Sequence, residues 1–161
     1  MGTAWDGLRL IGVVRTINAL KSGRKLTLQK KYEAALASFD AALAVHPGDA
    51  RATSERGYAR LLSGDRTGAA ADFEEAAEPT TDAKLLGQIW FNRGLVDDDD
   101  ANARVAFYLS NQYSPTEAAK KKLGEGPVCP ILVARPKAAK SGQPTLAASD
   151  LPKLYYVGRT S

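Results

Sequence analysis

The residue types that most often carry chemistry are scarce in this chain. Its only histidine, His46, stands directly before Pro47, where a role in a turn or on the surface is far commoner than a role as a general base. Its only cysteine, Cys129, has no second cysteine with which to form a disulfide or a zinc site. No phosphate-binding glycine loop, no GxSxG and no HExxH motif occurs. We therefore expect a protein that is not an enzyme, with no catalytic residue, no cofactor and no metal site.

The one dense cluster of ligand-type side chains is the run of four aspartates at residues 97–100. The run lacks the glycine and the alternating oxygen spacing of a calcium-binding loop. An aspartate directly before a helix accepts a hydrogen bond from an N-terminal amide and is favoured by the helix dipole. The run therefore predicts that Asp99 or Asp100 caps a helix, with a divalent ion as the alternative.

The composition is that of an ordinary globular domain: 161 residues, 44% apolar and 25% charged. The net charge of +4 is distributed unevenly. Residues 1–31 carry seven Lys and Arg against one Asp, residues 32–100 carry six against fourteen acids, and residues 101–161 carry nine against three. The acidic middle argues against a continuous nucleic-acid-binding stripe, so no nucleic acid is expected as a partner.

No apolar run reaches the roughly 18 residues that a membrane-spanning helix needs. The one candidate segment, Leu8 to Leu20, is interrupted by Arg9 and Arg15. The same two arginines fall where the apolar region of a secretory signal should be. We expect a soluble protein, cytoplasmic by default, or a protein of the cell envelope if a longer precursor carries a signal.

Residue types recur along the chain at an offset of 34. Five pairs of identical residues are separated by 34 positions: Gly23 and Gly57, Leu28 and Leu62, Ala35 and Ala69, Phe39 and Phe73, Ala42 and Ala76. A third copy continues with Ala103, Phe107 and Ser110. Its glycine, Gly94, comes 37 residues after Gly57 and is therefore shifted by three. A period of this length is typical of stacked supersecondary units.

Each copy has the pattern of a helical hairpin. Tyr32, Leu36, Phe39 and Leu43 follow one another at spacings of three and four, which predicts a helix that ends near Pro47. The repeated glycines and alanines allow two helices to approach closely, and the repeated phenylalanines fill the space beside them. Turns are predicted at residues 47–49 between copies and at residues 64–65 within the second copy.

A 34-residue helical hairpin with these small residues, an aromatic residue at repeat position 24 and proline at position 32 resembles the tetratricopeptide repeat (TPR) family. The segments Arg56-Gly57 and Arg93-Gly94 look like the short Arg-Gly stretch common in bacterial-type TPR proteins. The resemblance covers residues 16–123, with repeats at 16–49, 50–83 and 87–115 and a capping helix at 115–123. It implies an all-α, right-handed solenoid of three hairpins.

The capping helix opens with Ser114-Pro115-Thr116-Glu117, which has the form of a capping box with Pro115 at the first helical position. Such a helix covers the last hairpin of an array. From residue 124 the chain is basic and rich in proline, which indicates an extended or partly disordered tail with short strands possible at 128–133 and 154–157.

The N-terminal stretch, residues 7–29, is longer than one TPR helix. Leu10, Val14 and Ile17 lie on one stripe, with Val13 and Leu20 adjacent and basic residues around the polar side. We expect this stripe to pack on the first repeat and close its end. The alternative is a basic amphipathic helix that lies on an anionic membrane.

The resemblance implies a non-catalytic protein–protein interaction scaffold, because the first helices of TPR hairpins line a groove that takes an extended peptide or a partner helix. Carried over by register, the groove residues are Leu20, Arg24, Thr27 and Leu28; Arg51, Ser54, Glu55, Tyr58, Leu61 and Leu62; and Gln88, Phe91, Asn92 and Leu95. Tyr58 and Phe91 are the expected anchors. A membrane-surface or cell-envelope assembly factor and an accessory subunit of an enzyme complex are the alternatives, and the partner's identity and the oligomeric state stay open.

Overall fold

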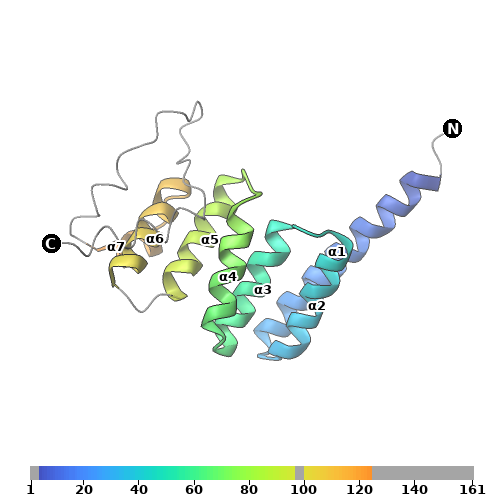
Figure 1. Cartoon of the computed structure of the whole chain (residues 1–161), viewed down its shortest axis with the longest axis horizontal. Helices are drawn as coiled ribbons and strands as arrows, with labels where there is room; N and C mark the ends of the chain where they lie inside the picture. Colours follow the sequence, from blue (N-terminus) through green and yellow to red (C-terminus); the bar gives the residue numbers. More distant parts are fainter. Residues whose placement is uncertain (1–3, 97–99, 125–161) are drawn as a thin grey trace. The chain divides into compact units, whose positions relative to one another are not determined.

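The computed structural model describes residues 4–96 and 100–124, and within these residues every regular element is an α-helix (Figure 1). The described residues form seven helices: α1 (Ala4–Leu28), α2 (Tyr32–Val45), α3 (Ala50–Ser63), α4 (Arg66–Ala77), α5 (Ala83–Val96), α6 (Asp100–Tyr113) and α7 (Glu117–Leu123). The predicted all-α class is confirmed for this part of the chain. The predicted tail begins at residue 124, and its residues 125–161 lie outside the described residues, as do Asp97 to Asp99 of the acidic run.

The chain divides into two compact units, Met1–Asp72 and Phe73–Ser161, and the boundary falls inside α4. In both units, helices that follow one another in the sequence pack side by side: α1 on α2 and α2 on α3 in the first, α5 on α6 and α6 on α7 in the second. This is the packing expected of a helical repeat.

The core of the first unit forms where α1 and α2 lie antiparallel. Its buried residues are Leu20, Ala35, Phe39, Ala42, Ala52 and Ala59. Gly23 of α1 faces the ring of Phe39, and a Cβ atom at this position would come within 2.5 Å of the ring. The glycine therefore sets the close approach of the two helices, and the phenylalanine fills the space between them, as the repeat pattern predicts.

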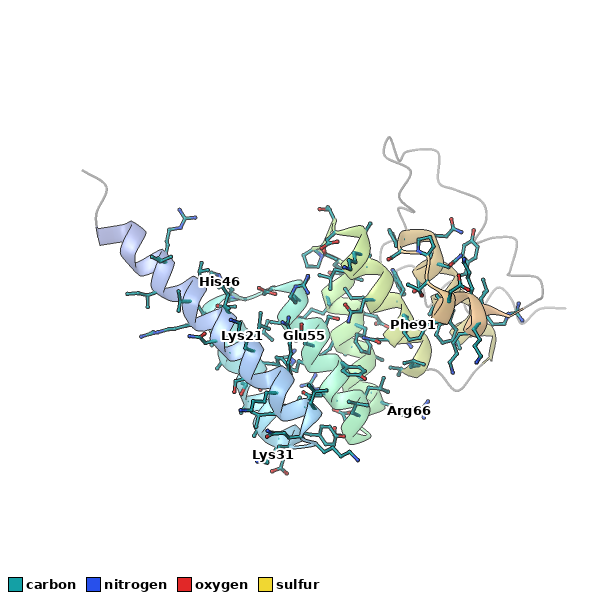
Figure 2. The ribbon with its side chains drawn as sticks, turned by 180° about the vertical axis from the view of Figure 1, so that it is seen from behind. Lys21, Lys31, His46, Glu55, Arg66 and Phe91 are labelled. Carbon is teal, nitrogen blue, oxygen red and sulfur yellow. The ribbon has the colours of Figure 1, made fainter. Side chains whose placement is uncertain are left out.

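The N-terminal half of α1 does not pack as predicted. Leu10, Val14 and Ile17 are exposed, so the expectation that their stripe covers the first repeat is wrong. The reason is that the stripe points away from α2, because α1 meets α2 through another side of the helix, which carries Thr16, Leu20 and Gly23. The end of α2 lies beside Gly12, where an added Cβ would be 3.4 Å from Val45 Cγ1 and 3.9 Å from His46 Nε2, and α1 continues past this point (Figure 2). His46 caps the end of α2 and is exposed.

The predicted turns of the first unit are confirmed, and their residues are the ones the backbone needs. Gly48 and Gly64 have φ values of 80° and 94°, which an L side chain rarely adopts. Asp49 is the N-cap of α3 and accepts a hydrogen bond of 2.9 Å from the backbone N–H of Ala52. Asp65 accepts one of 2.9 Å from the backbone N–H of Gly68 and starts α4 in the same way.

The second unit repeats the glycine–phenylalanine contact. A Cβ atom at Gly94 of α5 would come within 2.7 Å of the ring of Phe107 on α6. A cluster of buried apolar residues forms the core of this unit, and its members are Leu86, Trp90, Val105, Ala106 and Leu109. Helix α5 begins at Ala83, earlier than residue 87, where the pattern places the third repeat. Asp82 explains the early start, because its carboxylate accepts hydrogen bonds from the backbone N–H groups of Lys84 and Leu85.

Helix α7 begins two residues later than the predicted residue 115, and Ser114 is not its N-cap. The N-cap is Thr116, whose hydroxyl accepts a hydrogen bond of 3.1 Å from the backbone N–H of Ala119. Pro115 therefore lies before the helix and not at its first position. Two hydroxyl residues flank this proline, and the spacing alone does not decide which of them caps the helix.

Candidate binding surfaces

Four of the six predicted groove residues of α3 lie on one face of the helix, which we call the α3 stripe, and three of these four are exposed. Arg51, Tyr58 and Leu62 are all exposed, and Glu55 lies between them at the spacing of a single helix face. Tyr58 and Leu62 are four residues apart, so their side chains are neighbours on this face. The stripe offers an aromatic and an aliphatic side chain to a partner of the first unit.

A bidentate ion pair joins α3 to α1 within this stripe. Arg24 donates from Nε to Glu55 Oε2 at 2.6 Å, and its Nη2 donates to Glu55 Oε1. The hydrogen bonds to Glu55 raise the pKa of the Arg24 guanidinium. Figure 2 shows Glu55 on the face of α3 that meets α1. Arg24 and Glu55 therefore satisfy each other, and a partner would meet a neutral pair there.

Several other predicted groove residues do not face solvent. Ser54 in the first unit and Asn92 in the second are buried, as are Leu20 and Thr27 of α1. Arg24, Leu28 and Gln88 are exposed, whereas Leu61, Phe91 and Leu95 are partly buried. The carry-over by register therefore includes side chains that turn toward the core.

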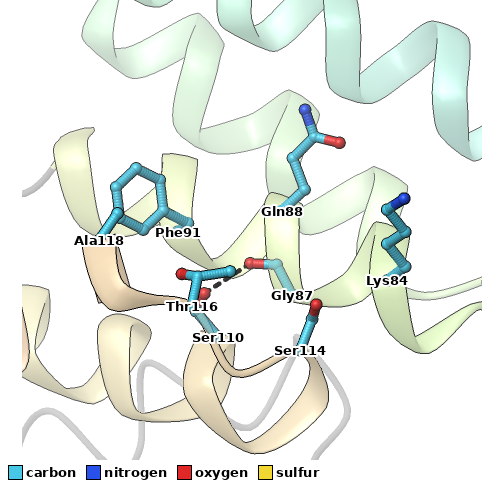
Figure 3. A pocket seen from close by; sticks show the side chains of 8 residues that line it. All are labelled: Lys84, Gly87, Gln88, Phe91, Ser110, Ser114, Thr116 and Ala118. Carbon is cyan, nitrogen blue, oxygen red and sulfur yellow. Dashed lines mark hydrogen bonds between the residues drawn. The ribbon is translucent and has the colours of Figure 1, made fainter. Parts of the chain in front are cut away.

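In the second unit, Gln88 and Phe91 line a pocket of about 330 Å³ (Figure 3). Its wall is made by α5, the end of α6 and the start of α7, and the lining residues are Lys84, Gly87, Gln88, Phe91, Ser110, Ser114, Thr116 and Ala118. Its volume lies at the lower end of the range of roughly 300 to 1,000 Å³ that small ligands and inserted side chains occupy.

The polar groups at the base of this pocket are held in place. Ser110 Oγ donates a hydrogen bond of 2.7 Å to the carbonyl oxygen of Gly87, as Figure 3 shows. Gly87 has no room for a side chain, because a Cβ there would clash with the side chain of Ser114 and lie 3.1 Å from its backbone nitrogen. The ring of Phe91 rests against Phe107, with 5.5 Å between centroids and a tilt of 58°. Phe91 thus belongs partly to the core and partly to the pocket wall.

The first unit contains a buried cluster of charged side chains that the sequence analysis does not predict. The side chain of Asp72 in α4 is 2% exposed. Its carboxylate accepts two hydrogen bonds from the guanidinium group of Arg56, one of 3.1 Å from Nε and one of 2.7 Å from Nη2. Arg60 Nη1 lies 2.8 Å from the same carboxylate. The pKa of Arg56 is raised, mainly because its guanidinium group donates hydrogen bonds to Asp72. Burial of Arg56 has the opposite effect and lowers this pKa.

A second ion pair recurs with the repeat, and its spacing is a signal that the sequence does contain. Arg56 Nη1 donates to Asp40 Oδ1 at 2.9 Å, which joins α3 to α2. Arg93 Nη2 donates to Glu74 Oε1 at 3.2 Å, which joins α5 to α4. The two acids are 34 residues apart, and each arginine stands directly before a repeat glycine. The Arg-Gly segments therefore link the first helix of a hairpin to the second helix of the preceding hairpin.

No group of three His, Cys, Asp or Glu side chains that could hold a metal ion occurs among the residues that the structure describes. Across the same residues, each helix is too short or too polar to cross a lipid bilayer. Comparison of the chain with protein-family models, with curated proteins and with solved structures found no match.

Proposed function

We propose that this chain is a TPR-type helical-repeat protein that binds an extended peptide or a single helix of another protein and catalyses no reaction. The observation that carries the proposal is the recurrence of two contacts in both units. The Gly23–Phe39 contact returns as Gly94–Phe107, and the Arg56–Asp40 ion pair returns as Arg93–Glu74. Each contact comes from residue types that repeat along the sequence.

Repeated contacts of this kind support a role in binding because of how repeat arrays are built. Each hairpin packs only on its neighbours, so the helices that carry the repeat contacts in a unit also leave outward side chains on that unit. The α3 stripe with Tyr58 and Leu62 provides such side chains in the first unit. Aromatic side chains contribute most to the energy of protein interfaces, which makes Tyr58 the expected anchor.

The pocket of the second unit supports the same function. It is bounded on one side by Phe91, and Lys84 and Gln88 provide donors among its lining residues. An apolar side chain of a bound peptide fits such a pocket, and the amide of Gln88 is able to hold the peptide backbone by hydrogen bonds. In this proposal, the α3 stripe of the first unit and the pocket of the second unit are each a surface for a peptide segment.

A selection of phage-displayed peptides against the whole chain tests the proposal, with affinities then measured by fluorescence polarisation. Ala118→Leu fills the pocket without removing any contact, and Tyr58→Ala removes the exposed ring of the stripe. We expect each variant to weaken the peptides that bind its own surface by at least roughly tenfold, the size of effect expected when an interface anchor is lost.

The matched control is Ala44→Leu, which makes the same change at an exposed alanine of α2, outside the stripe and the pocket. It should leave the affinity unchanged. A selection that enriches no peptide, or peptides that bind all three variants as tightly as the unchanged chain, would refute the proposed function.

A further inference from the structure

The N-terminal half of α1 carries an apolar face that the described residues of its unit leave exposed. Its members have between 44% and 65% of their surface exposed, and they are Leu10, Ile11, Val13, Val14 and Ile17. At about 100° of turn per residue, the five occupy an arc of about 160° around the helix. We call them the α1 apolar face. Isolated apolar residues are common on protein surfaces, but a contiguous cluster of this width marks a contact site.

The position of the face follows from the packing of α1. Thr16, Leu20 and Gly23 are buried and turn toward α2, whereas the apolar face points away from that contact. Helix α2 ends beside Gly12, so residues before Gly12 extend beyond it (Figure 1). The face therefore lies on the outer, convex surface of α1, and its members Leu10 and Ile11 extend beyond the end of α2.

Charge identifies what can cover this face. Residues 7–31 contain seven Lys and Arg and no acid, and Arg9, Arg15, Lys21 and Lys25 are exposed. A second copy of this chain would bring like charges together along the contact, which is unfavourable. The occupant must combine an apolar interior with a negative surface. A convex apolar arc flanked by arginines and lysines matches the boundary between the headgroups and acyl chains of an anionic bilayer.

We propose that the N-terminal half of α1 binds the surface of an anionic membrane, with the helix lying in the plane of the bilayer. The α1 apolar face enters the region below the headgroups, and Arg9 and Arg15 at its two borders remain at the level of the lipid phosphates. Lys21, further along the helix, contributes to the attraction at longer range. The site is independent of the peptide-binding residues proposed above, because it uses none of them.

Flotation of the whole chain with vesicles tests this site. The vesicles are phosphatidylcholine alone or phosphatidylcholine mixed with phosphatidylglycerol, at low and at high salt. We expect the chain to float with the anionic vesicles at low salt and to lose most of this binding at high salt. Leu10→Ser/Val14→Ser/Ile17→Ser should abolish flotation while the helical circular dichroism signal is kept, because the three side chains are exposed.

A pair of charge variants separates this site from general attraction of a basic protein. Arg9→Gln/Arg15→Gln/Lys21→Gln should lower the partition coefficient on anionic vesicles by roughly a hundredfold, at about a fivefold effect for each basic residue. Lys120→Gln/Lys121→Gln/Lys122→Gln removes the same charge from α7 and should change it little.

Four results would overturn the proposal. They are an unchanged chain that does not float at low salt, a triple serine variant that floats as well as the unchanged chain, equal losses in the two charge variants, and a concentration-dependent dimer in sedimentation equilibrium that the serine variant abolishes. The last result would assign the α1 apolar face to a second copy.

Discussion

At the scale of single residues, the most consequential side chain is Asp72. Its buried carboxylate is shared by Arg56 and Arg60, so one acid compensates two cations inside the first unit. A buried pair of this kind is costly to break, because removal of one member leaves a desolvated charge without its main counter-ion. The neighbouring acid Asp40 contacts the same Arg56 but is 58% exposed.

Asp72→Ala should lower the free energy of unfolding by about 3 to 5 kcal/mol, measured by urea denaturation. The matched control is Asp40→Ala, which removes an exposed partner of the same arginine and should cost less than about 1 kcal/mol. Equal losses in the two variants would show that burial of the Asp72 carboxylate does not set its contribution.

Tyr113 gives the second unit a dependence on alkaline pH. Burial raises the pKa of its hydroxyl above the ordinary value of about 10. The folded chain therefore holds this proton more tightly than the unfolded chain does. The stabilisation is fully present below about pH 10 and is lost as the pH rises through the folded pKa. Stability curves measured by urea denaturation from neutral to alkaline pH should fall less steeply for Tyr113→Phe than for the unchanged chain.

At the scale of helices, two glycines of α1 differ in whether the surrounding structure leaves room for a side chain. An added Cβ at Gly23 would collide with Phe39, whereas one at Gly7 would have no atom within 4 Å. Alanine is favoured over glycine inside a helix by up to about 1 kcal/mol. Gly7→Ala should therefore leave the melting temperature unchanged or raise it. Gly23→Ala should lower it, because overpacking costs about 1 to 3 kcal/mol. The same direction of change in both variants would contradict the packing described for α1 and α2.

The sequence predicts most of the helix positions, because the signals are local. The period of 34, Gly64 at its positive φ and Asp49 at its N-cap each depend on residues close in the chain. The predictions are wrong where the outcome depends on tertiary packing. Whether Leu10, Val14 and Ile17 are covered depends on which side of α1 meets α2. Which of two hydroxyl residues begins α7 depends on the geometry of the turn. Neither can be obtained from periodicity.

At the scale of the whole chain, the repeat pattern predicts which aromatic residues stabilise it and which remain available to a partner. Phe73 is buried, and Phe73→Ala should lower the free energy of unfolding by roughly 3 to 5 kcal/mol. Tyr58 is exposed, so Tyr58→Ala should leave the midpoint of urea denaturation nearly unchanged. A reversal of the two effects would show that the repeats are assigned in the wrong register.

The candidate site is less predictable than the fold. Register places Tyr58 and Leu62 on the surface and brings Gln88 and Phe91 to one pocket, yet it also selects Ser54 and Asn92, which are buried. Adjacent positions on a helix differ by about 100° in direction, so a small local rotation turns a side chain from solvent to core. The ion pairs of Asp72 are not predicted, because they form only when α4 packs against α3 and buries the carboxylate. The composition of the chain does not show which acidic residues become buried in this way.

The contact of Gly23 with Phe39 has a consequence for how such a chain can diverge. The ring occupies the volume that any side chain at position 23 would need, and the same holds for Phe107 and position 94. Substitutions at the two members of a pair are therefore not independent: a larger residue on one helix is tolerated only when the facing ring becomes smaller. Related sequences should covary at these paired positions, and double variants such as Gly23→Ala/Phe39→Leu should be more stable than the sum of their single changes implies.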